Sequence, residues 1–350
     1  MQGFWSTLPR PVMVLAPMAG VTDGAFRRIV AKYGKPHVLV TEFTSTDGLC
    51  SPGRGNLLLD FVYSEPERPI VAQIFGNKPE NFARTAELLA TMGFDGIDIN
   101  CGCPDKNVEK QGAGSALIRS PETIVALVRA CRDAAPHLPV TVKTRLGYHE
   151  VEISNLLNRV LEAEPAAITV HWRTRQEMSK VPARWELAQS AVEVVRASGL
   201  PTLLLGNGDV QSLGQAHELA RETGVDGVMV GRGIYGNPWF FNPAFNDEPP
   251  IWQDKLKVMM EHSHLFLEIF GDHKHFPVMK KYYKGYVTDF PGAKELRIEV
   301  MEARDIQAVE AHVRAFFAAH GEDLDAPMSP ERQPQAAATA MTTATPAVAE

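Results

Sequence analysis

Short apolar segments rich in Val, Ile and Leu alternate with longer amphipathic segments over the first two thirds of the chain. The apolar segments have the length of buried β-strands, and the amphipathic segments have the period of about 3.6 residues that indicates helices. Strands are predicted over residues 12–16, 38–41, 69–75, 96–100, 139–144, 167–171, 202–206 and 225–231. Helices are predicted over residues 23–33, 79–92, 120–134, 152–163, 186–197 and 212–223.

This alternation favours an α/β fold with parallel strands and the helices outside them. Eight strand–helix units are the number expected for a (β/α)8 TIM barrel. A doubly wound open sheet is the competing fold, but no G-x-G-x-x-G turn follows the first predicted strand. Thr22 or Asp23 is the expected cap of the first helix, and Pro79 and Pro121 suit the first turns of theirs.

The pattern changes near residue 246. Residues 252–269, 278–286, 293–302 and 306–320 have helical periodicity with no strands between them. From residue 321 the chain is rich in Ala, Thr and Pro, which predicts a disordered tail, above all over residues 337–350. We therefore expect a barrel domain over residues 1–245, a small helical domain over residues 246–320 and a tail over residues 321–350.

Composition narrows the class of protein. Hydrophobic residues make up 45% and charged residues 22% of the chain, as in soluble globular proteins. No apolar run is long enough to span a bilayer and the N-terminus lacks a signal pattern, so we expect a cytoplasmic protein without membrane contact. Cys101 and Cys103 have no second pair at metal-site spacing, so no metal is expected. The net charge of −7 argues against a generic nucleic-acid binder but leaves room for local basic patches.

Polar and reactive residues gather where the predicted strands end. In TIM barrels this rim holds the active site. The candidates, in chain order, are Pro17, Met18 and Ala19; Gln73; Asn100 and Cys103; Lys143 and Arg145; His171 and Arg173; Asn207, Gly208 and Asp209; and Gly231 and Arg232.

The residues after the seventh and eighth strands suggest an anion site. Small residues there let backbone N–H groups approach a phosphate, and Arg232 could add a charged clamp. The glycines could instead serve only as tight turns, but both segments together favour a phosphate-bearing ligand. His171 could bind the same anion or be a buried core histidine, and the sequence leaves both open.

Lys143 and Cys103 each allow more than one chemistry. The lysine could form a Schiff base, hold a cofactor by charge, or extend to solvent. A free thiol has a pKa near ~8.5, so Cys103 could act as a general acid as well as a nucleophile. Cysteine is also often a small buried hydrophobic residue, and Cys101 fits that description better.

Several runs resemble the bacterial, FMN-dependent tRNA-dihydrouridine synthase family. The most specific is N-C-G-C-P at residues 100–104. The others are residues 16–23, 41–43, 71–76, 112–117, 142–147, 170–175, 206–209 and 231–233, with a weaker match at 290–293.

The resemblance implies a flavin enzyme that acts on tRNA in two domains, an FMN-binding barrel and a tRNA-binding helical domain. NADPH would reduce FMN, hydride would pass to C6 of a uridine, and Cys103 would protonate C5. The resemblance places Pro17, Met18, Ala19, Gln73 and Lys143 at the flavin, which removes support from the Schiff base. It places His171, Asn207, Gly208, Asp209, Gly231 and Arg232 around the phosphate, and Asn100 and Arg145 at the uracil.

One segment departs from the family pattern. Relatives usually have glycine where this chain has Trp172, an aromatic residue near Ser179 and glycine near Val181. We expect residues 172–185 to face the substrate side of the rim and to influence which uridine is reduced.

Two basic segments are candidate RNA contacts, although a solvated helix face would have the same composition. The first combines Lys274, Lys280, Lys281 and Lys284 with Tyr282, Tyr283 and Tyr286 as stacking residues; the second is Arg173, Arg175, Lys180 and Arg184. Two other functions stay open: a small-molecule FMN reductase such as a dihydroorotate dehydrogenase-like or ene-reductase-like enzyme, and an RNA-binding protein without catalysis. We expect a monomer.

Overall fold

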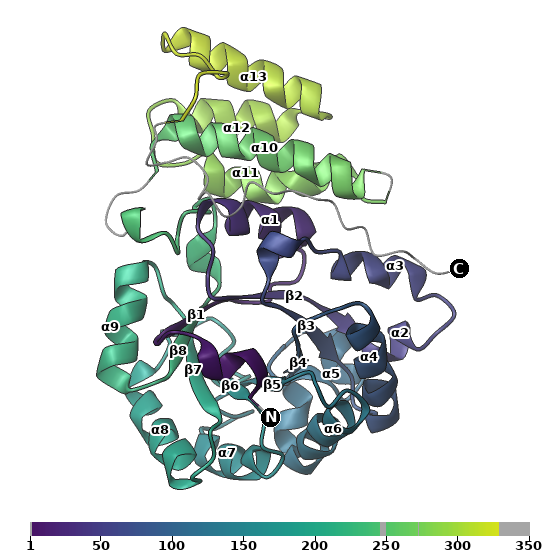
Figure 1. Cartoon of the computed structure of the whole chain (residues 1–350). Coiled ribbons are helices and arrows are strands. Elements are labelled where there is room, and N and C mark those ends of the chain that lie inside the picture. The colour runs from purple at the N-terminus through teal and green to yellow at the C-terminus, as the bar shows by residue number, and fades with distance from the viewer. Residues whose placement is uncertain (1, 246–249, 272, 329–350) are drawn as a thin grey trace.

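Eight parallel strands close into a barrel in chain order, with β8 paired to β1 (Figure 1). The structure is a computed structural model, described for residues 2–245, 250–271 and 273–328. The predicted (β/α)8 barrel is confirmed and the open sheet is wrong. The strands are β1 Val12–Leu15, β2 Val38–Ser45, β3 Ile70–Phe75, β4 Gly96–Asn100, β5 Val140–Arg145, β6 Ala167–His171, β7 Leu203–Asn207 and β8 Gly227–Val230.

Helices cover the outside of the barrel. Asp23 caps the first of them by accepting the N–H of Phe26, and Pro79 and Pro121 lie in first turns, as predicted. The helices are α1 Gly24–Tyr33, α2 Thr46–Leu49, α3 Gly55–Leu58, α4 Pro79–Thr91, α5 Lys106–Lys110, α6 Pro121–Ala134, α7 Ile153–Leu161, α8 Ala188–Ala197 and α9 Leu213–Thr223.

Strand β2 is longer than predicted. Its pairing with β3 shifts register between Val40 and Phe43 and then resumes to Ser45. The polar residues Thr41 and Glu42 lie at this irregularity. Polar residues interrupt the apolar pattern here, and the predicted strand therefore ended at Thr41.

Alternate strand residues divide between two cores. One set packs outward against the helices, and the other fills the barrel interior together with Trp5. Trp5 belongs to a 3-10 helix, Gly3–Thr7, that precedes β1. Because Trp5 closes the amino-terminal end of the barrel, the interior opens toward the carboxyl ends of the strands.

The predicted helices after the barrel are confirmed as α10 Trp252–Phe270, α11 Lys280–Tyr286, α12 Ala293–Glu302 and α13 Ile306–Ala319, and they stack above α1 in Figure 1. Contacts to the barrel run through α1 and its cap: Lys32 Nζ lies 2.6 Å from Glu261 Oε1, and the Tyr282 hydroxyl donates to Val21 O at 2.6 Å. In the described residues no helix has the length and apolarity to cross a membrane. Most of the predicted tail, residues 329–350, lies outside the described residues.

Candidate active site at the carboxyl ends of the strands

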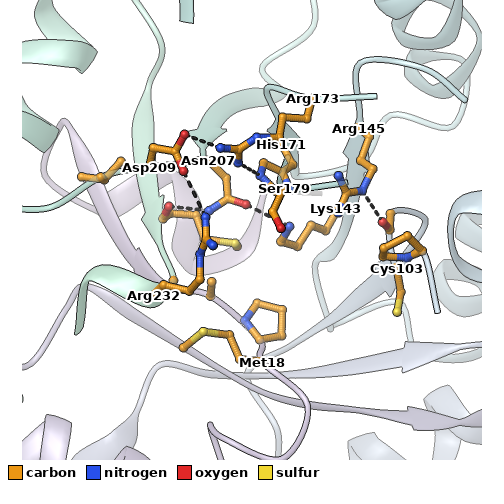
Figure 2. Close-up of a pocket in the computed structure, with 18 of the residues that line it drawn as sticks. Met18, Cys103, Lys143, Arg145, His171, Arg173, Ser179, Asn207, Asp209 and Arg232 are labelled. Carbon is orange, nitrogen blue, oxygen red and sulfur yellow. Dashed lines mark hydrogen bonds and ion pairs between the residues drawn. The ribbon is translucent and has the colours of Figure 1, made fainter. Parts of the chain in front are cut away.

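A cavity of about 320 Å³ lies at the carboxyl ends of the strands (Figure 2). Of the predicted site residues, Ala19 is exposed beside the cavity rather than in its lining, and Lys280, Lys281 and Lys284 lie on α11. The lining includes Pro17, Met18, Gln73, Asn100, Cys103, Lys143, Arg145, His171, Arg173, Asn207, Gly208, Asp209, Gly231 and Arg232.

One end of the cavity is cationic. Arg173 and Arg232 both pair with the carboxylate of Asp209, and the hydrogen bond from Arg173 is the main reason that the pKa of Asp209 is lowered. Arg173 is 2% exposed and also donates to His171 Nε2 at 2.9 Å. Arg173, which the sequence predicted to contact substrate, lines this cationic end of the cavity.

His171 is neutral in this environment. Burial, followed by the charges of Lys143, Arg145, Arg173 and Arg232, holds its pKa well below the usual range. Because arginine can only donate, Nε2 is the acceptor and Nδ1 carries the proton. The side chain is therefore an uncharged imidazole whose one N–H is at Nδ1.

The turn after β7 is closely packed around Gly208. Gly208 has a φ of +130°, and a Cβ there would meet Ala183 at 2.8 Å and His171 at 3.1 Å. Trp185 Nε1 donates to Gly208 O at 2.8 Å, which fixes the turn. Gly208 also lines the cavity, and the packing of Ala183 and His171 leaves no room for a side chain at this position.

Lys143 lies between the two ends of the cavity (Figure 2). Its Nζ lies 3.2 Å from Asn207 Oδ1. Burial, with a contribution from Arg145, lowers the pKa of Lys143 to about 8. The amine therefore remains mostly protonated at neutral pH and can stabilise negative charge on a ligand.

Cys103 lies at the other end, in a turn that Asn100 organises (Figure 2). Asn100 Oδ1 accepts the N–H groups of Gly102 at 3.1 Å and Cys103 at 2.9 Å. Burial raises the pKa of the Cys103 thiol, so the thiol is protonated at neutral pH, as a proton donor requires. Cys101 is fully buried in the core, which confirms its structural role.

Asp98 is a buried site residue that the sequence analysis missed. Gln73 Nε2 donates to Asp98 Oδ2 at 2.6 Å, and Asn100 Nδ2 donates to Gln73 Oε1 at 3.0 Å. The Cys103 turn is thus tied through two amides to a carboxylate inside the barrel. The signal was present, since Asp98 is a charged residue within an otherwise apolar strand segment.

Arg145 reaches from β5 across the Cys103 turn. Its Nε donates to Gly102 O at 2.6 Å, and its Nη1 donates to Met178 O at 3.1 Å. Burial lowers its pKa to about 10, which leaves it cationic at neutral pH. Arg145 therefore brings a permanent positive charge to the same end of the cavity as the thiol.

The first predicted RNA patch is partly wrong. Tyr282, Tyr283 and Tyr286 are 1%, 0% and 1% exposed, because α11 packs against both α10 and α12 and turns these rings into the core. They are not available for stacking on bases. Lys281 is half-buried with its Nζ 4.7 Å from the centre of the Tyr282 ring.

The second predicted patch is largely neutralised. All three of its arginines form ion pairs: Arg173 with Asp209, Arg175 with Glu109 and Arg184 with Glu177. Only part of the segment that contains these arginines lies at the cavity. Met178 and Ser179 line the cavity, but Trp172 is fully buried against Trp185.

Fold and site together define a TIM-barrel protein whose cavity joins a cationic end to a protonated thiol. Within that class, the chain belongs to the dihydrouridine synthase family (Dus), whose model matches residues 14–320. It is 43% identical over 329 residues to a probable tRNA-dihydrouridine synthase of Staphylococcus aureus (strain COL), covering 92% of this chain and 98% of that relative. It is 40% identical over 322 residues to probable tRNA-dihydrouridine synthase 2 of Bacillus subtilis (strain 168), covering 90% and 97%.

Solved structures support the fold. The 6-hydroxypseudooxynicotine amine oxidase from Pseudomonas geniculata N1 aligns with a TM-score of 0.51 at 14% identity, over 75% of this chain and 53% of that one. Histamine dehydrogenase from Rhizobium sp. 4-9 aligns with a TM-score of 0.51 at 13% identity, over 72% and 48%. At these identities the likeness shows the fold alone.

Proposed function

We propose that this protein reduces the C5=C6 bond of a uridine in tRNA to dihydrouridine, with FMN as cofactor, NADPH as reductant and Cys103 as proton donor. The observation that carries the proposal is one cavity with a cationic end, a central lysine and a protonated thiol. Family membership and the names of the relatives support tRNA as the substrate.

The residues present fit FMN. Arg232, His171 and the backbone at Gly208 would hold its phosphate, and Lys143 would lie where negative charge on the ring needs stabilisation. When bound, FMN supplies the hydride that is added to C6 of the uracil. NADPH as the source of that hydride rests on the family resemblance.

The chain's own residues complete the reaction at C5. Addition at C6 leaves enolate character at C5, because the double bond is conjugated to a carbonyl, and the Cys103 thiol donates the proton that quenches it. The resulting thiolate regains a proton from solvent. Arg145 would hold the uracil by charge, and the target base must leave its stack to enter the cavity.

The alternatives are less well supported. A dihydroorotate dehydrogenase-like reductase would use the same cavity, but the family match extends to residue 320 and so includes helices that a small-molecule substrate does not require. An RNA-binding protein without catalysis would not need a protonated Cys103 beside Lys143.

Dihydrouridine mapping tests the proposal. We expect the purified protein to carry a yellow flavin, and tRNA from a deletion strain to lose dihydrouridine at one or more positions. Wild-type protein should restore the modification, and Cys103→Ala should fail to restore it while keeping the flavin. Unchanged dihydrouridine at every position of the deletion strain's tRNA would contradict the proposed function.

A further inference from the structure

The segment that carries Cys103 is packed tightly on itself. The Cys103 carbonyl accepts the N–H of Ser115 at 3.0 Å, and Asp105 caps the short helix α5 between them. Gly114 has a φ of +60°, and a Cβ there would meet the Cys103 carbonyl at 2.8 Å. A displacement of α5 would therefore move the Cys103 backbone as well.

Glu109, on α5, joins this segment to a second one. Arg175 Nε lies 2.8 and 3.0 Å from the two carboxylate oxygens of Glu109, and its Nη2 pairs with the same group. Ser115 Oγ lies 2.9 Å from Glu109 Oε1 and 2.8 Å from the Cys103 carbonyl. The single hydroxyl proton of Ser115 can be donated to either acceptor, and the ionised carboxylate is the stronger of the two.

Tyr148 adds a third point of attachment. Its ring lies 4.4 Å from the guanidinium of Arg119, which follows Ser115 in the Cys103 segment, and 5.6 Å from that of Arg175. Arg175 N–H also donates to Gly147 O at 2.9 Å. The segments after β4, β5 and β6 thus meet around one arginine.

We propose that the Glu109–Arg175 ion pair is a latch that holds the Cys103 segment in place and fixes the thiol for proton transfer. Neither residue lines the cavity, so both are positioning residues that act through Cys103. The part that concerns catalysis rests on the proposed function, whereas the contact itself does not.

The latch stays closed across the physiological pH range. The hydrogen bonds from Arg175 lower the pKa of Glu109 to about 2. The carboxylate is therefore ionised at neutral pH, and its pairing is lost only in strong acid.

Thiol reactivity in the holoenzyme tests the latch without tRNA. Iodoacetamide labelling, read at Cys103 by peptide mapping, should be about fivefold faster in Glu109→Gln and Arg175→Gln than in wild type, because a released segment exposes the thiol. The charge-swapped double variant Glu109→Arg, Arg175→Glu should return labelling toward the wild-type rate. Glu177→Gln breaks a comparable ion pair in the β6–α8 segment, residues 172–187, and should leave labelling unchanged.

Measuring flavin reduction and flavin reoxidation separately distinguishes a misplaced thiol from general damage to the protein. Reduction of the flavin by NADPH should be unchanged in Glu109→Gln, while reoxidation by tRNA should be slower by about ten- to a hundredfold, the effect of a small misplacement of a reacting group. Wild-type labelling and wild-type reoxidation in both single variants would overturn the latch. Faster labelling in the variants, with no reoxidation of the wild-type flavin by any tRNA, would support the latch and overturn the proposed function.

Discussion

At the scale of single residues, burial determines the protonation of the Cys103 thiol. Burial is the largest effect on its pKa and raises it. The backbone hydrogen bond from Asp105 and the charges of Arg145 and Lys143 oppose the rise only in part. A raised pKa keeps the proton on sulfur at neutral pH, which suits a proton donor and not a resting nucleophile.

The pH dependence of alkylation measures this directly. Because only the thiolate reacts, the labelling rate of Cys103 should rise with pH toward a midpoint above the ordinary value of ~8.5. A midpoint below neutral pH would show a resting thiolate and would contradict the role of acid. The fully buried Cys101 and Cys131 serve as internal controls, since they should stay unlabelled in the folded protein.

At the scale of elements, the β6–α8 segment supports the turn after β7. Asp209 accepts from Arg173 and from the Ala183 N–H at 2.9 Å, and Trp185 donates to Gly208 O. Trp172, which departs from the family pattern, packs against Trp185 and so takes part in this support indirectly. Within this segment, Arg173, Met178 and Ser179 line the cavity.

Gly208→Ala tests that support. The added methyl group would collide with Ala183 and His171 at a φ that L-residues rarely adopt, so we expect a loss of about 1–3 kcal/mol in the free energy of unfolding. Weaker flavin retention should accompany it. Gly55→Ala is the matched control, because a Cβ there meets nothing within 4 Å. Equal urea midpoints for the two variants would show that the Gly208 turn is not sterically restricted.

At the scale of the whole molecule, buried aromatic and polar groups join the C-terminal helices to the barrel. His262 on α10 packs against Phe26 of α1, with ring centres 5.7 Å apart, and against Tyr282 of α11 at 4.5 Å. Burial lowers the pKa of His262 to about 4. The charge of Asp23 opposes this effect and the charge of Lys281 adds to it, both to a smaller extent. The junction is therefore built around a neutral histidine.

This histidine makes stability depend on pH. Its pKa is about 4 in the folded protein and near ~6.5 when unfolded, so the unfolded state binds the extra proton between these values. Stability should fall as pH drops from about 6.5 to about 4, with His262 contributing up to about 1.4 kcal/mol per pH unit. His262→Gln should flatten this slope in urea unfolding, and the exposed control His137→Gln should not. Equal slopes in all three proteins would refute a buried neutral His262.

The sequence alone determined the barrel and most of the rim. Alternation of apolar and amphipathic segments specifies element type locally, and in a closed parallel barrel the residues after the strands must meet at one end. That is why Cys103, Lys143, His171 and Arg232 could be assigned to one site before any contact was known.

Only the tertiary structure decided which polar groups face one another. The tyrosines of α11 are buried because neighbouring helices cover them, and Arg173 turns to Asp209 because the turn after β7 brings the carboxylate to it. The pairing of Glu109 with Arg175 joins residues far apart in the chain. Hydrophobic periodicity records the face that an element buries, but an ion pair depends on the distance between two side chains, and packing alone sets that distance.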